Sequence, residues 1–584
     1  MSTPRLLGLL PAAGDPRGPQ LQAPDVHRSG TLIVAIAGSP YWLGADSEVT
    51  HTPRFSEGVL AAYRRFGKQF LRQLHGSFAV AIVDTHSGTA LLAVDRMGIE
   101  RLTYRHLSTG GLAFSSSAEA LARLAGAAPV VRPQGLYDFL FSHMVPGPHT
   151  IFEGVMKLPP ATCASFDSGK LTLETYWRPE FVERGGDERR LAEELHATLA
   201  DAVRACKPNG HTGAFLSGGL DSSTVAGVLG KVIDGPPDTF SMGFGVEGFD
   251  ELRYARIANE RFKARAHEYH VTPADIVSMF ERIAAAYDEP FGNSSAVPTF
   301  YCAKVAAEHG MKRLLAGDGG DEIFGGNERY AKQRVFEAYY LLPAFLRSGV
   351  IEPLARRIAP EHGLMPLRKF RSYVDQASLR LPARLETWNL VFRTPPGELL
   401  APEFIATVDP QAPLRQMQKV YDAAPGSSTL NKMLYYDWYY TLADNDLRKV
   451  GTMCELAGIE VLFPMLDTRV VELSNRVPPG LKMRGAELRS FYKRAMQGFL
   501  PDEILNKSKH GFGLPFGEWL KTHKQLGELI YGHLSDFKRR GIVRAQFIDE
   551  LIEQHRGGHP SFYGYPIWDF AMLEAWLKAH LRAA

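Results

Sequence analysis

The sequence predicts an α+β domain built as a layered sandwich, followed by an α/β domain with a parallel sheet and a mainly helical C-terminal region. Three observations predict this: the chain has 584 residues, short β-like runs fill its first third, and strands then alternate with helices. A polar stretch, 178–190 (RPEFVERGGDERR), separates the two patterns. We therefore place the domains at residues 1–185 and 190–584.

The first domain is expected to contain a mostly antiparallel sheet layer with helices interposed. Gly, Pro and Asp residues punctuate its apolar runs, as the turns between short strands do. The runs that indicate strands are 31–36 (TLIVAI), 77–83 (SFAVAIV), 90–94 (ALLAV) and 111–115 (GLAFS).

The second domain is expected to contain a parallel sheet with helices on both faces, because strands and helices alternate along the chain. The predicted strands are 213–216, 239–244 and 313–316, and the predicted helices are 222–229 and 254–262. Beyond about residue 330, amphipathic and aromatic-rich segments predict helices. One of them, the run 435–440 (YYDWYY), is expected to lie mostly in the core.

Composition excludes several functional classes. Apolar residues make up 45% of the chain and charged residues 22%, and the formal net charge is +2, so we expect a soluble protein without a nucleic-acid partner. No apolar stretch is long enough to span a bilayer, and we expect no membrane partner. The four cysteines show no paired spacing, which argues against zinc or disulfides and favours a cytoplasmic location. The oligomeric state stays open.

The strongest local signal is the segment 217–223 (SGGLDSS), which follows an apolar strand and opens a helix. Glycines allow backbone N–H groups to approach phosphate oxygens, and the helix N-terminus favours anions. Asp221 fits such a site only with a cation such as Mg²⁺ beside it. The alternative is a Gly/Ser turn with a helix cap. The expected nucleotide contacts in this segment are Ser217, Gly218, Gly219, Asp221, Ser222 and Ser223.

A glycine-rich acidic loop, 317–326 (GDGGDEIFGG), follows the strand at 313–316. Like charges so close together make a poor structural turn unless a cation relieves their repulsion. Asp221 and Asp321 follow separate strands of one parallel sheet, so both are expected to reach one Mg²⁺ at its carboxyl edge. Gly317 and Gly319 are expected to contact the nucleotide. The alternative is a solvated acidic loop.

A lysine-containing loop, 507–515 (KSKHGFGLP), is the third element. An accessible lysine here could neutralise a departing pyrophosphate and the negative charge of a transition state. Taken alone, such a loop is more often solvated surface. Lys507 and Arg489 are secondary candidates for the same electrostatic role.

These motifs together resemble the synthetase domain of the asparagine synthetase superfamily, and the segment 217–223 resembles the pyrophosphate loop of ATP pyrophosphatases. The supporting segments are 74–79 (LHGSFA), 95–99 (DRMGI), 287–291 (YDEPF), 463–467 (FPMLD) and 511–520. The resemblance implies cleavage of ATP between its α- and β-phosphates, with an adenine site at Met242 and Gly243. It also implies that Lys509 is catalytic. Asp318 takes the place of an acidic residue in ammonia-using relatives, either as a proton acceptor or as a second-shell ligand.

The first domain resembles a class II glutamine amidotransferase, in which a cysteine exposed by removal of the initiator Met attacks glutamine. This sequence starts Met1-Ser2-Thr3, and its first cysteine is Cys163. Ala37-Gly38-Ser39 replaces the family's Asn-Gly-Glu, which holds glutamine. The resemblance therefore predicts an inactive glutaminase.

Thiol-less first domains on intact adenylating domains also occur among β-lactam synthetases and lasso-peptide cyclases. We expect an ATP- and Mg²⁺-dependent amide ligase that joins a small-molecule or short-peptide carboxylate to an amine. Under the cyclase interpretation, a precursor peptide and its protease are further partners. The alternatives are an asparagine synthetase that uses aspartate and ammonia, and a non-catalytic protein that retains the fold.

Overall fold

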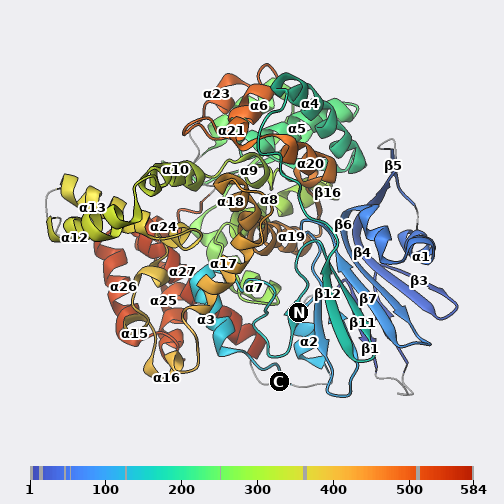
Figure 1. Ribbon diagram of the computed structural model, residues 1–584, viewed down its shortest axis with the longest axis horizontal. Helices are drawn as coiled ribbons and strands as arrows, with labels where there is room; N and C mark the ends of the chain where they lie inside the picture. The colour runs from blue at the N-terminus through green and yellow to red at the C-terminus, as the bar shows by residue number, and fades with distance from the viewer. Residues whose placement is uncertain are drawn as a thin grey trace.

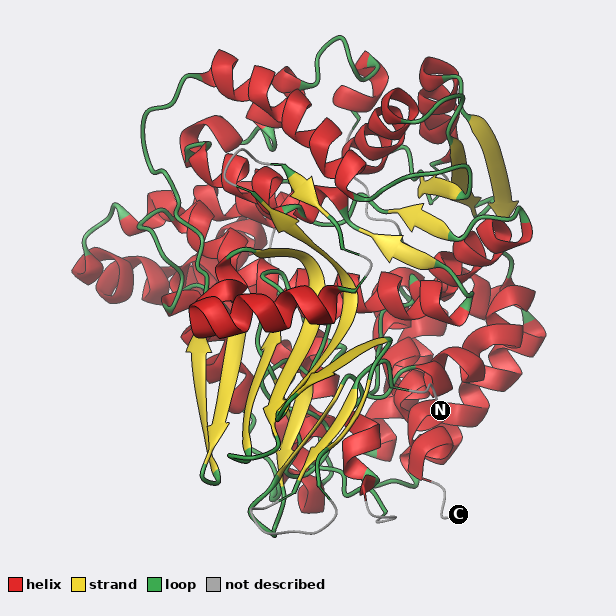
Figure 2. Ribbon diagram, turned by 90° about the vertical axis from the view of Figure 1, so that its right-hand side faces the viewer, coloured by secondary structure: helices red, strands yellow, loops and turns green. Residues whose placement is uncertain are grey.

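The computed structural model describes residues 4–11, 18–44, 48–52, 54–124, 128–246, 248–249, 251–358, 365–507 and 513–581. Antiparallel sheets form the first part of the chain, and a parallel sheet surrounded by helices forms the second (Figures 1 and 2). Both layers agree with the fold class expected from the sequence.

Two antiparallel sheets pack face to face in the first domain. The smaller has the order β10 (Met156–Lys157), β8 (Thr103–His106), β9 (Leu112–Ser115), β1 (Leu7–Leu10), β2 (Gln20–Gln22). The larger has the order β12 (Lys170–Thr175), β11 (Thr162–Asp167), β7 (Thr89–Val94), β6 (Leu74–Asp84), β4 (Leu32–Leu43), β3 (Asp25–Ser29), with β5 (Val49–Thr50) paired to β4.

Strand β6 explains why one predicted run is continuously apolar. Ala79, Ala81 and Val83 enter the core between the two sheets, whereas Phe78 and Val80 point to the opposite face. The helix α1 (Phe55–Phe66) crosses that opposite face and covers it (Figures 1 and 2). Because both faces of the strand are buried, period-two alternation of polar and apolar residues is lost.

The second domain is built on a five-stranded parallel sheet with the order β15 (Arg265–His270), β14 (Asp238–Gly243), β13 (Thr212–Phe215), β16 (Arg313–Leu315), β17 (Glu460–Leu462). The three predicted strands are confirmed as β13, β14 and β16. The strand order reverses at β13, because β14 and β15 extend the sheet on one side of it and β16 and β17 on the other. Open α/β sheets bind ligands at the carboxyl ends of such strands.

Helices cover both faces of this sheet, as expected. One group packs around the phosphate-loop helix: α4 (Glu188–Ala205), α5 (Leu220–Val232) and α6 (Leu252–Phe262). The other group comprises α7 (Pro273–Ala286), α8 (Ala296–Glu308) and α19 (Leu447–Leu456). The predicted helices 222–229 and 254–262 therefore lie within α5 and α6.

The rest of the second domain is helical. Four helices form a projection at the edge of the molecule: α10 (Glu328–Tyr340), α11 (Ala344–Leu346), α12 (Glu352–Ile358) and α13 (Met365–Ser378) (Figure 1). Further helices of this domain are α17 (Ala412–Asp422), α18 (Thr429–Asp437), α20 (Thr468–Arg476), α22 (Ser490–Ala495), α24 (Phe516–Thr522), α25 (Lys524–Lys538), α26 (Ala545–Gly557) and α27 (Pro560–Leu581). No helix in the described ranges is both long and apolar enough to cross a bilayer.

The aromatic run 435–440 lies where α18 passes into a π-helix, η5 (Trp438–Asp446), which leads into α19. Five of its six side chains are buried, Tyr439 being partly exposed, so the expectation of a mostly core segment is confirmed. π-helical turns are uncommon and occur often at functional sites.

The two domains share one continuous hydrophobic core, which includes Phe152 of the first domain and Trp576 of α27. Buried charges also cross between them, because Lys157 pairs with Glu289 at 2.9 Å. The division at residues 185–190 follows β12, overlaps the first residues of α4 and stays a prediction.

Candidate active site

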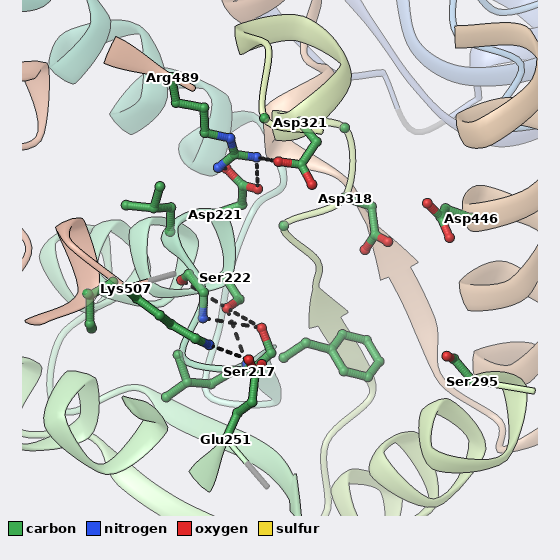
Figure 3. A pocket seen from close by; sticks show the side chains of 18 of the residues that line it. Ser217, Asp221, Ser222, Glu251, Ser295, Asp318, Asp321, Asp446, Arg489 and Lys507 are labelled. Atoms are coloured by element: carbon green, nitrogen blue, oxygen red, sulfur yellow. Dashed lines mark hydrogen bonds and ion pairs between the residues drawn. The ribbon is translucent and has the colours of Figure 1, made fainter. Parts of the chain in front are cut away.

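A cavity of about 750 Å³ opens at the carboxyl ends of β13 and β16, at the reversal of the strand order. The loop after β13, the loop after β16 and the segment that precedes α22 line it together (Figure 3). Of the sequence-predicted residues, those that line the cavity are Ser217, Gly219, Asp221, Ser222, Met242, Gly317, Asp318, Gly319 and Asp321.

The loop after β13 is shaped by its own serines. The Ser217 N–H donates to Ser222 Oγ at 3.2 Å, and the two hydroxyl oxygens lie 3.0 Å apart. Gly219 forms the N-cap of α5 and makes no side-chain cap, and this helix N-terminus lines the cavity. This arrangement suits phosphate oxygens, which helix N-termini and successive N–H groups bind.

Three of the expected nucleotide contacts do not line the cavity. Gly218 has a φ of 72°, and a Cβ there would lie 2.5 Å from the backbone N of Ala255, so this glycine allows the loop to pack against α6. Ser223 is fully buried, and Gly243 is pressed against Leu252. In this structure the three residues pack the loop and the strand, and their expected contacts with a nucleotide stay a prediction.

The acidic loop is glycine-rich because it packs directly on the phosphate loop. A Cβ on Gly317 would lie 2.6 Å from Ser222 N, and a Cβ on Gly320 would lie 2.1 Å from Asp221 Oδ1. The glycines therefore bring two loops together that a side chain would separate. Gly319, with a φ of 97°, forms the N-cap of the short helix α9 (Gly320–Phe324) that carries Asp321.

Asp221 and Asp321 converge, as expected, and the cation beside them is Arg489 (Figure 3). The guanidinium donates to both oxygens of Asp221 at 2.7 and 2.6 Å and also to Asp321 Oδ1. Arg489 is only 4% exposed, and the two carboxylates raise the pKa of its guanidinium further above the ordinary value against the effect of burial. Arg489, a secondary candidate in the sequence analysis, thus lies at the centre of the site.

This pair of carboxylates fits a magnesium ion. Mg²⁺ is commonly held by one or two carboxylates together with substrate phosphates and water. The guanidinium shows that a positive charge is favourable between Asp221 and Asp321. Within the described ranges, no group of three or more His, Cys, Asp or Glu side chains forms a site for a metal ion, so the remaining ligands would come from phosphate and water.

Asp318 lies on the opposite side of the cavity from the phosphate loop, near η5 and α19 (Figure 3). Burial raises the pKa of Asp318 to about 6, partly opposed by the positive charge of Lys449. Lys449 is itself paired with Asp446 at 2.8 Å, at the end of the π-helix. A carboxylate that titrates near neutrality can accept a proton from an attacking amine.

Lys507 reaches the phosphate loop, whereas Lys509 lies outside the described residues together with 508 and 510–512. The Lys507 ammonium pairs with Glu251 at 2.8 Å and lies 4.6 Å above the ring of Tyr254. Its side chain is 8% exposed and lines the cavity. The expected catalytic role of Lys509 stays a prediction, and Lys507 is the described cation of that segment.

Four further residues line the cavity that the sequence did not predict to be there: Lys449, Asp446, Asn293 and Ser295. They come from η5, α19 and the segment before α8. No local motif marks them, because they reach the cavity only through the packing of α8 against α19. The π-helical turn is visible only in the folded chain.

The first domain presents no accessible thiol. Cys163, Cys302 and Cys454 are buried, and burial raises the thiol pKa of all four cysteines, that of partly buried Cys206 to about 12. The Ser39 hydroxyl, at the position of the family's glutamine-binding Glu, instead donates to Glu460 of β17 at 2.5 Å.

Asp95 of the first domain has a structural role. Its carboxylate accepts N–H bonds from Phe78, Met97, Ile99 and Glu100 at 2.8 to 3.2 Å, and the residue is 1% exposed. Those bonds fix the turn after β7.

Both parts of the chain match known protein families. Residues 194–578 match the family model described as asparagine synthase, and residues 44–177 match that of a glutamine amidotransferase domain. Asparagine synthetase [glutamine-hydrolyzing] 1 of Bacillus subtilis is 25% identical over 516 residues, which are 88% of this chain and 79% of that protein.

Two further relatives are similar over most of their length. A putative asparagine synthetase [glutamine-hydrolyzing] of Mycobacterium tuberculosis is 28% identical over 541 residues, 89% of this chain and 79% of that protein. Amidase chry2 of Gibberella zeae is 24% identical over 511 residues, 81% of this chain and 75% of that protein. The asparagine synthase match spans well over half of the chain, and the chain therefore belongs to the asparagine synthase family.

Proposed function

We propose that this chain, an ATP-dependent carbon–nitrogen ligase of the asparagine synthetase type, joins a carboxylate to an amine without hydrolysing glutamine. Membership in the family supplies the enzyme class and the use of ATP. The proposal that glutamine is not hydrolysed rests on one observation: none of the four cysteines supplies the first domain with an accessible thiol.

ATP is proposed to lie in the 750 Å³ cavity with its phosphates against the loop at 217–223. Asp221 and Asp321 would hold Mg²⁺, which supplies positive charge to the phosphates. A substrate carboxylate oxygen attacks the α-phosphorus, the bond to the β-phosphate oxygen breaks, and pyrophosphate leaves towards Lys507 and Arg489. Lys509 stands in the same role as a proposal from the family resemblance.

An amine then attacks the carbonyl carbon of the acyl-adenylate, and AMP leaves as the amide forms. The amine must lose a proton in this step. Asp318 is proposed to accept it, because its carboxylate faces the cavity and its pKa of about 6 leaves it deprotonated at neutral pH.

Glutamine independence is supported from the first domain. A nucleophilic thiol needs a lowered pKa and access, and burial raises the pKa of every cysteine here. Ser39 is engaged with Glu460 of the second domain. Under this proposal, the chain differs from its relatives named glutamine-hydrolyzing in that it does not hydrolyse glutamine.

Product analysis tests the nitrogen source. The purified protein is incubated with ATP, Mg²⁺ and a carboxylate panel, with glutamine, ammonium or a primary amine as nitrogen donor, and AMP, pyrophosphate and glutamate are measured. We expect AMP and pyrophosphate with ammonium or amine and no glutamate from glutamine. ADP with orthophosphate would contradict the adenylation step, whereas glutamate release would contradict only glutamine independence.

For the acyl substrate, we propose a small molecule or short peptide of specialised metabolism, such as a peptide whose ring is closed by an amide bond. Similarity to Amidase chry2 over 81% of the chain supports only that chemistry at an amide group occurs among the relatives. A precursor peptide and its protease would then be partners in the cytoplasm.

The second candidate is synthesis of asparagine from aspartate and ammonia, which the names of the bacterial relatives favour. Aspartate-dependent AMP formation with ammonium decides between the two. The non-catalytic alternative is set aside, because the family is one of ligases and the phosphate and acidic loops meet in one cavity.

A further inference from the structure

We propose that a helical arm, described over residues 328–358 and 365–378, is a docking surface for a bilayer that carries anionic lipid headgroups. The arm comprises α10, α11, α12 and α13 together with the π-helix η3 (Arg347–Ile351), and it stands out from the body of the molecule (Figure 1). The elements α11, η3, α12 and α13 pack mainly on one another and on α10.

The arm carries more than half of the exposed large apolar side chains in the described ranges. Of the sixteen most exposed large apolar side chains in the described ranges, nine lie on the arm and a tenth, Trp388, just beyond it. Leu341 is 86% exposed and Phe345 70%, at the turn between α10 and α11. The others on the arm are Val335, Tyr340, Leu342, Val350, Leu354, Met365 and Phe370. Scattered single apolar residues need no explanation, but a concentration on one projection indicates a contact surface.

The arm is also basic. Residues 328–378 contain nine Lys or Arg and five Asp or Glu, a formal net charge of +4, whereas the whole chain has a net charge of +2. Arg368 and Lys369 are exposed on α13 between the exposed side chains of Met365 and Phe370. Helices that combine basic and apolar side chains bind anionic membrane surfaces through both buried apolar area and charge.

The turn that carries Leu341 is held in a fixed shape. The Arg347 guanidinium lies 4.5 Å from the ring of Tyr340, and its Nε donates to the carbonyl of Leu342 at 3.0 Å. The Tyr340 hydroxyl donates to the carbonyl of Leu379 at 3.1 Å. Tyr and Arg beside projecting Leu and Phe side chains match the depth order of a bilayer, with aromatic and basic groups at headgroup level and aliphatic groups below.

Charge and shape favour a bilayer over protein partners. In a symmetric contact with a second copy, the same basic surface would face itself, and like charges would repel. An acidic amphipathic helix of a partner protein would need a groove in which to bind. Neither of the two large cavities, of about 750 and 280 Å³, has a lining residue between 329 and 388. A projecting convex tip instead suits a bilayer surface, which requires no shape complementarity.

Docking through the arm would bring the cavity close to the membrane surface. Glu328, the first residue of α10, lines the cavity, and a helix of 13 residues is about 20 Å long. From the sequence we expect no membrane partner, because no apolar stretch is long enough to span a bilayer. That criterion does not detect a surface that forms only when several short helices pack together.

Vesicle co-sedimentation tests the proposal with the full chain. We expect binding to vesicles with 30% phosphatidylglycerol in phosphatidylcholine, at least tenfold weaker binding to phosphatidylcholine alone, and weaker binding at high salt. Leu341→Glu with Phe345→Glu should lower binding to the anionic vesicles at least tenfold, and Arg368→Glu with Lys369→Glu should lower it severalfold. Val130→Glu, at a 63% exposed position of the first domain, is the matched control and should bind as wild type.

Each variant is also checked for its circular dichroism spectrum and for ATP–pyrophosphate exchange without vesicles, which should be unchanged because none of these positions lines the cavity. Equal binding to neutral and anionic vesicles, no binding at all, or an equal loss in the Val130→Glu control would overturn the proposal. Light scattering that finds a dimer in the wild type and a monomer in the Leu341→Glu/Phe345→Glu variant would assign the arm to self-association instead.

Discussion

Arg489 organises the cavity at the scale of a single residue. It adopts a left-handed backbone conformation, with a φ of 54°, at the N-cap of α22, which is strained for a residue other than glycine. The guanidinium holds Asp221 from one loop and Asp321 from another. It therefore occupies the position at which the two carboxylates would hold a divalent cation.

Replacing Arg489 should show whether its guanidinium competes with a divalent cation for Asp221 and Asp321. With Arg489→Gln, less positive charge lies between Asp221 and Asp321, so binding of Mn²⁺ without ATP should become at least tenfold tighter. Titration followed by electron paramagnetic resonance measures it directly. Arg494→Gln, which alters a neighbouring Arg paired with Glu188, should leave Mn²⁺ affinity near that of wild type. Unchanged affinity in Arg489→Gln would show that the two aspartates do not form a metal site.

Asp318 allows the two chemical steps to be separated. Asp318→Asn should leave ATP–pyrophosphate exchange within about twofold and lower amide formation by roughly 10²–10⁴-fold, the usual contribution of a general base. Because burial raises its pKa to about 6, the wild-type amide rate should rise with pH through about 6, and the variant should lack that rise. Equal losses in both steps would instead indicate a role in binding or in positioning the loop.

Lys482 provides a test of stability. It is 1% exposed, its ammonium has no hydrogen-bond partner among the described residues, and burial lowers its pKa to about 7. The unfolded chain, with an ordinary lysine pKa, binds more protons than the folded chain between about pH 7 and 10, so the free energy of unfolding should rise with pH there. Lys482→Met should stabilise the protein at pH 7 by about 1–3 kcal/mol and remove this rise. Urea unfolding at several pH values measures both effects.

At the scale of elements, two glycine-rich loops meet edge to edge, and glycine permits their contact. The segment 217–223 packs against α6 through Gly218 and against the acidic loop through Gly317 and Gly320. On the far side, the π-helix η5 directs Asp446 towards Lys449 at the cavity. The site is thus built from the ends of strands on one side and an irregular helix on the other.

A single methyl group should disrupt the contact between the loops. The Cβ of Gly320→Ala would lie 2.1 Å from Asp221 Oδ1, so the acidic loop must move and ATP–pyrophosphate exchange should fall at least tenfold. Gly480→Ala in the helix α21 (Pro479–Lys482) is the matched control, since nothing lies within 4 Å of its Cβ. Wild-type exchange in Gly320→Ala would contradict the described packing of the two loops.

At the scale of the whole molecule, buried charges join the two domains. Glu289 accepts hydrogen bonds from Ile151 N of the first domain at 2.9 Å and from Arg448 at 3.2 Å, and it pairs with Lys157. Its neighbour Asp288 accepts from Ala118 N at 2.7 Å, and nearby positive charge lowers the Asp288 pKa to about 2. The first domain is therefore a structural partner of the second.

Breaking this network should destabilise both domains together. Glu289→Ala leaves Lys157 buried without its paired carboxylate and leaves Arg448 paired with Asp288 alone. Removing one partner of a buried ion pair typically costs about 3–5 kcal/mol. Calorimetry should record one transition at a lower temperature. Glu193→Ala, which removes an exposed pair with Arg189, should change stability by less than about 0.5 kcal/mol. Two separate transitions in the wild type would show instead that the domains unfold independently.

The sequence predicted those parts of the site that are local in the chain. The apolar run before Ser217 and the glycines after it lie together in the sequence, so strand, loop and helix could be recognised at once. Asp221 and Asp321 could be paired because parallel strands end at one edge of the sheet. Lys449 and Asp446 could not be found, because no local pattern distinguishes them from the surrounding core helix.

By itself, the sequence determined the order of the two layers, the phosphate loop, the acidic loop and the absence of a cysteine before residue 163. Each of these depends on neighbouring residues, whose spacing fixes their local conformation. The tertiary structure alone decided that Arg489 stands between the aspartates, that Gly218 and Ser223 support the loop from behind, and that apolar and basic side chains share one projecting arm. Those contacts join residues that are far apart in sequence, so only the packing of helices and strands brings them together.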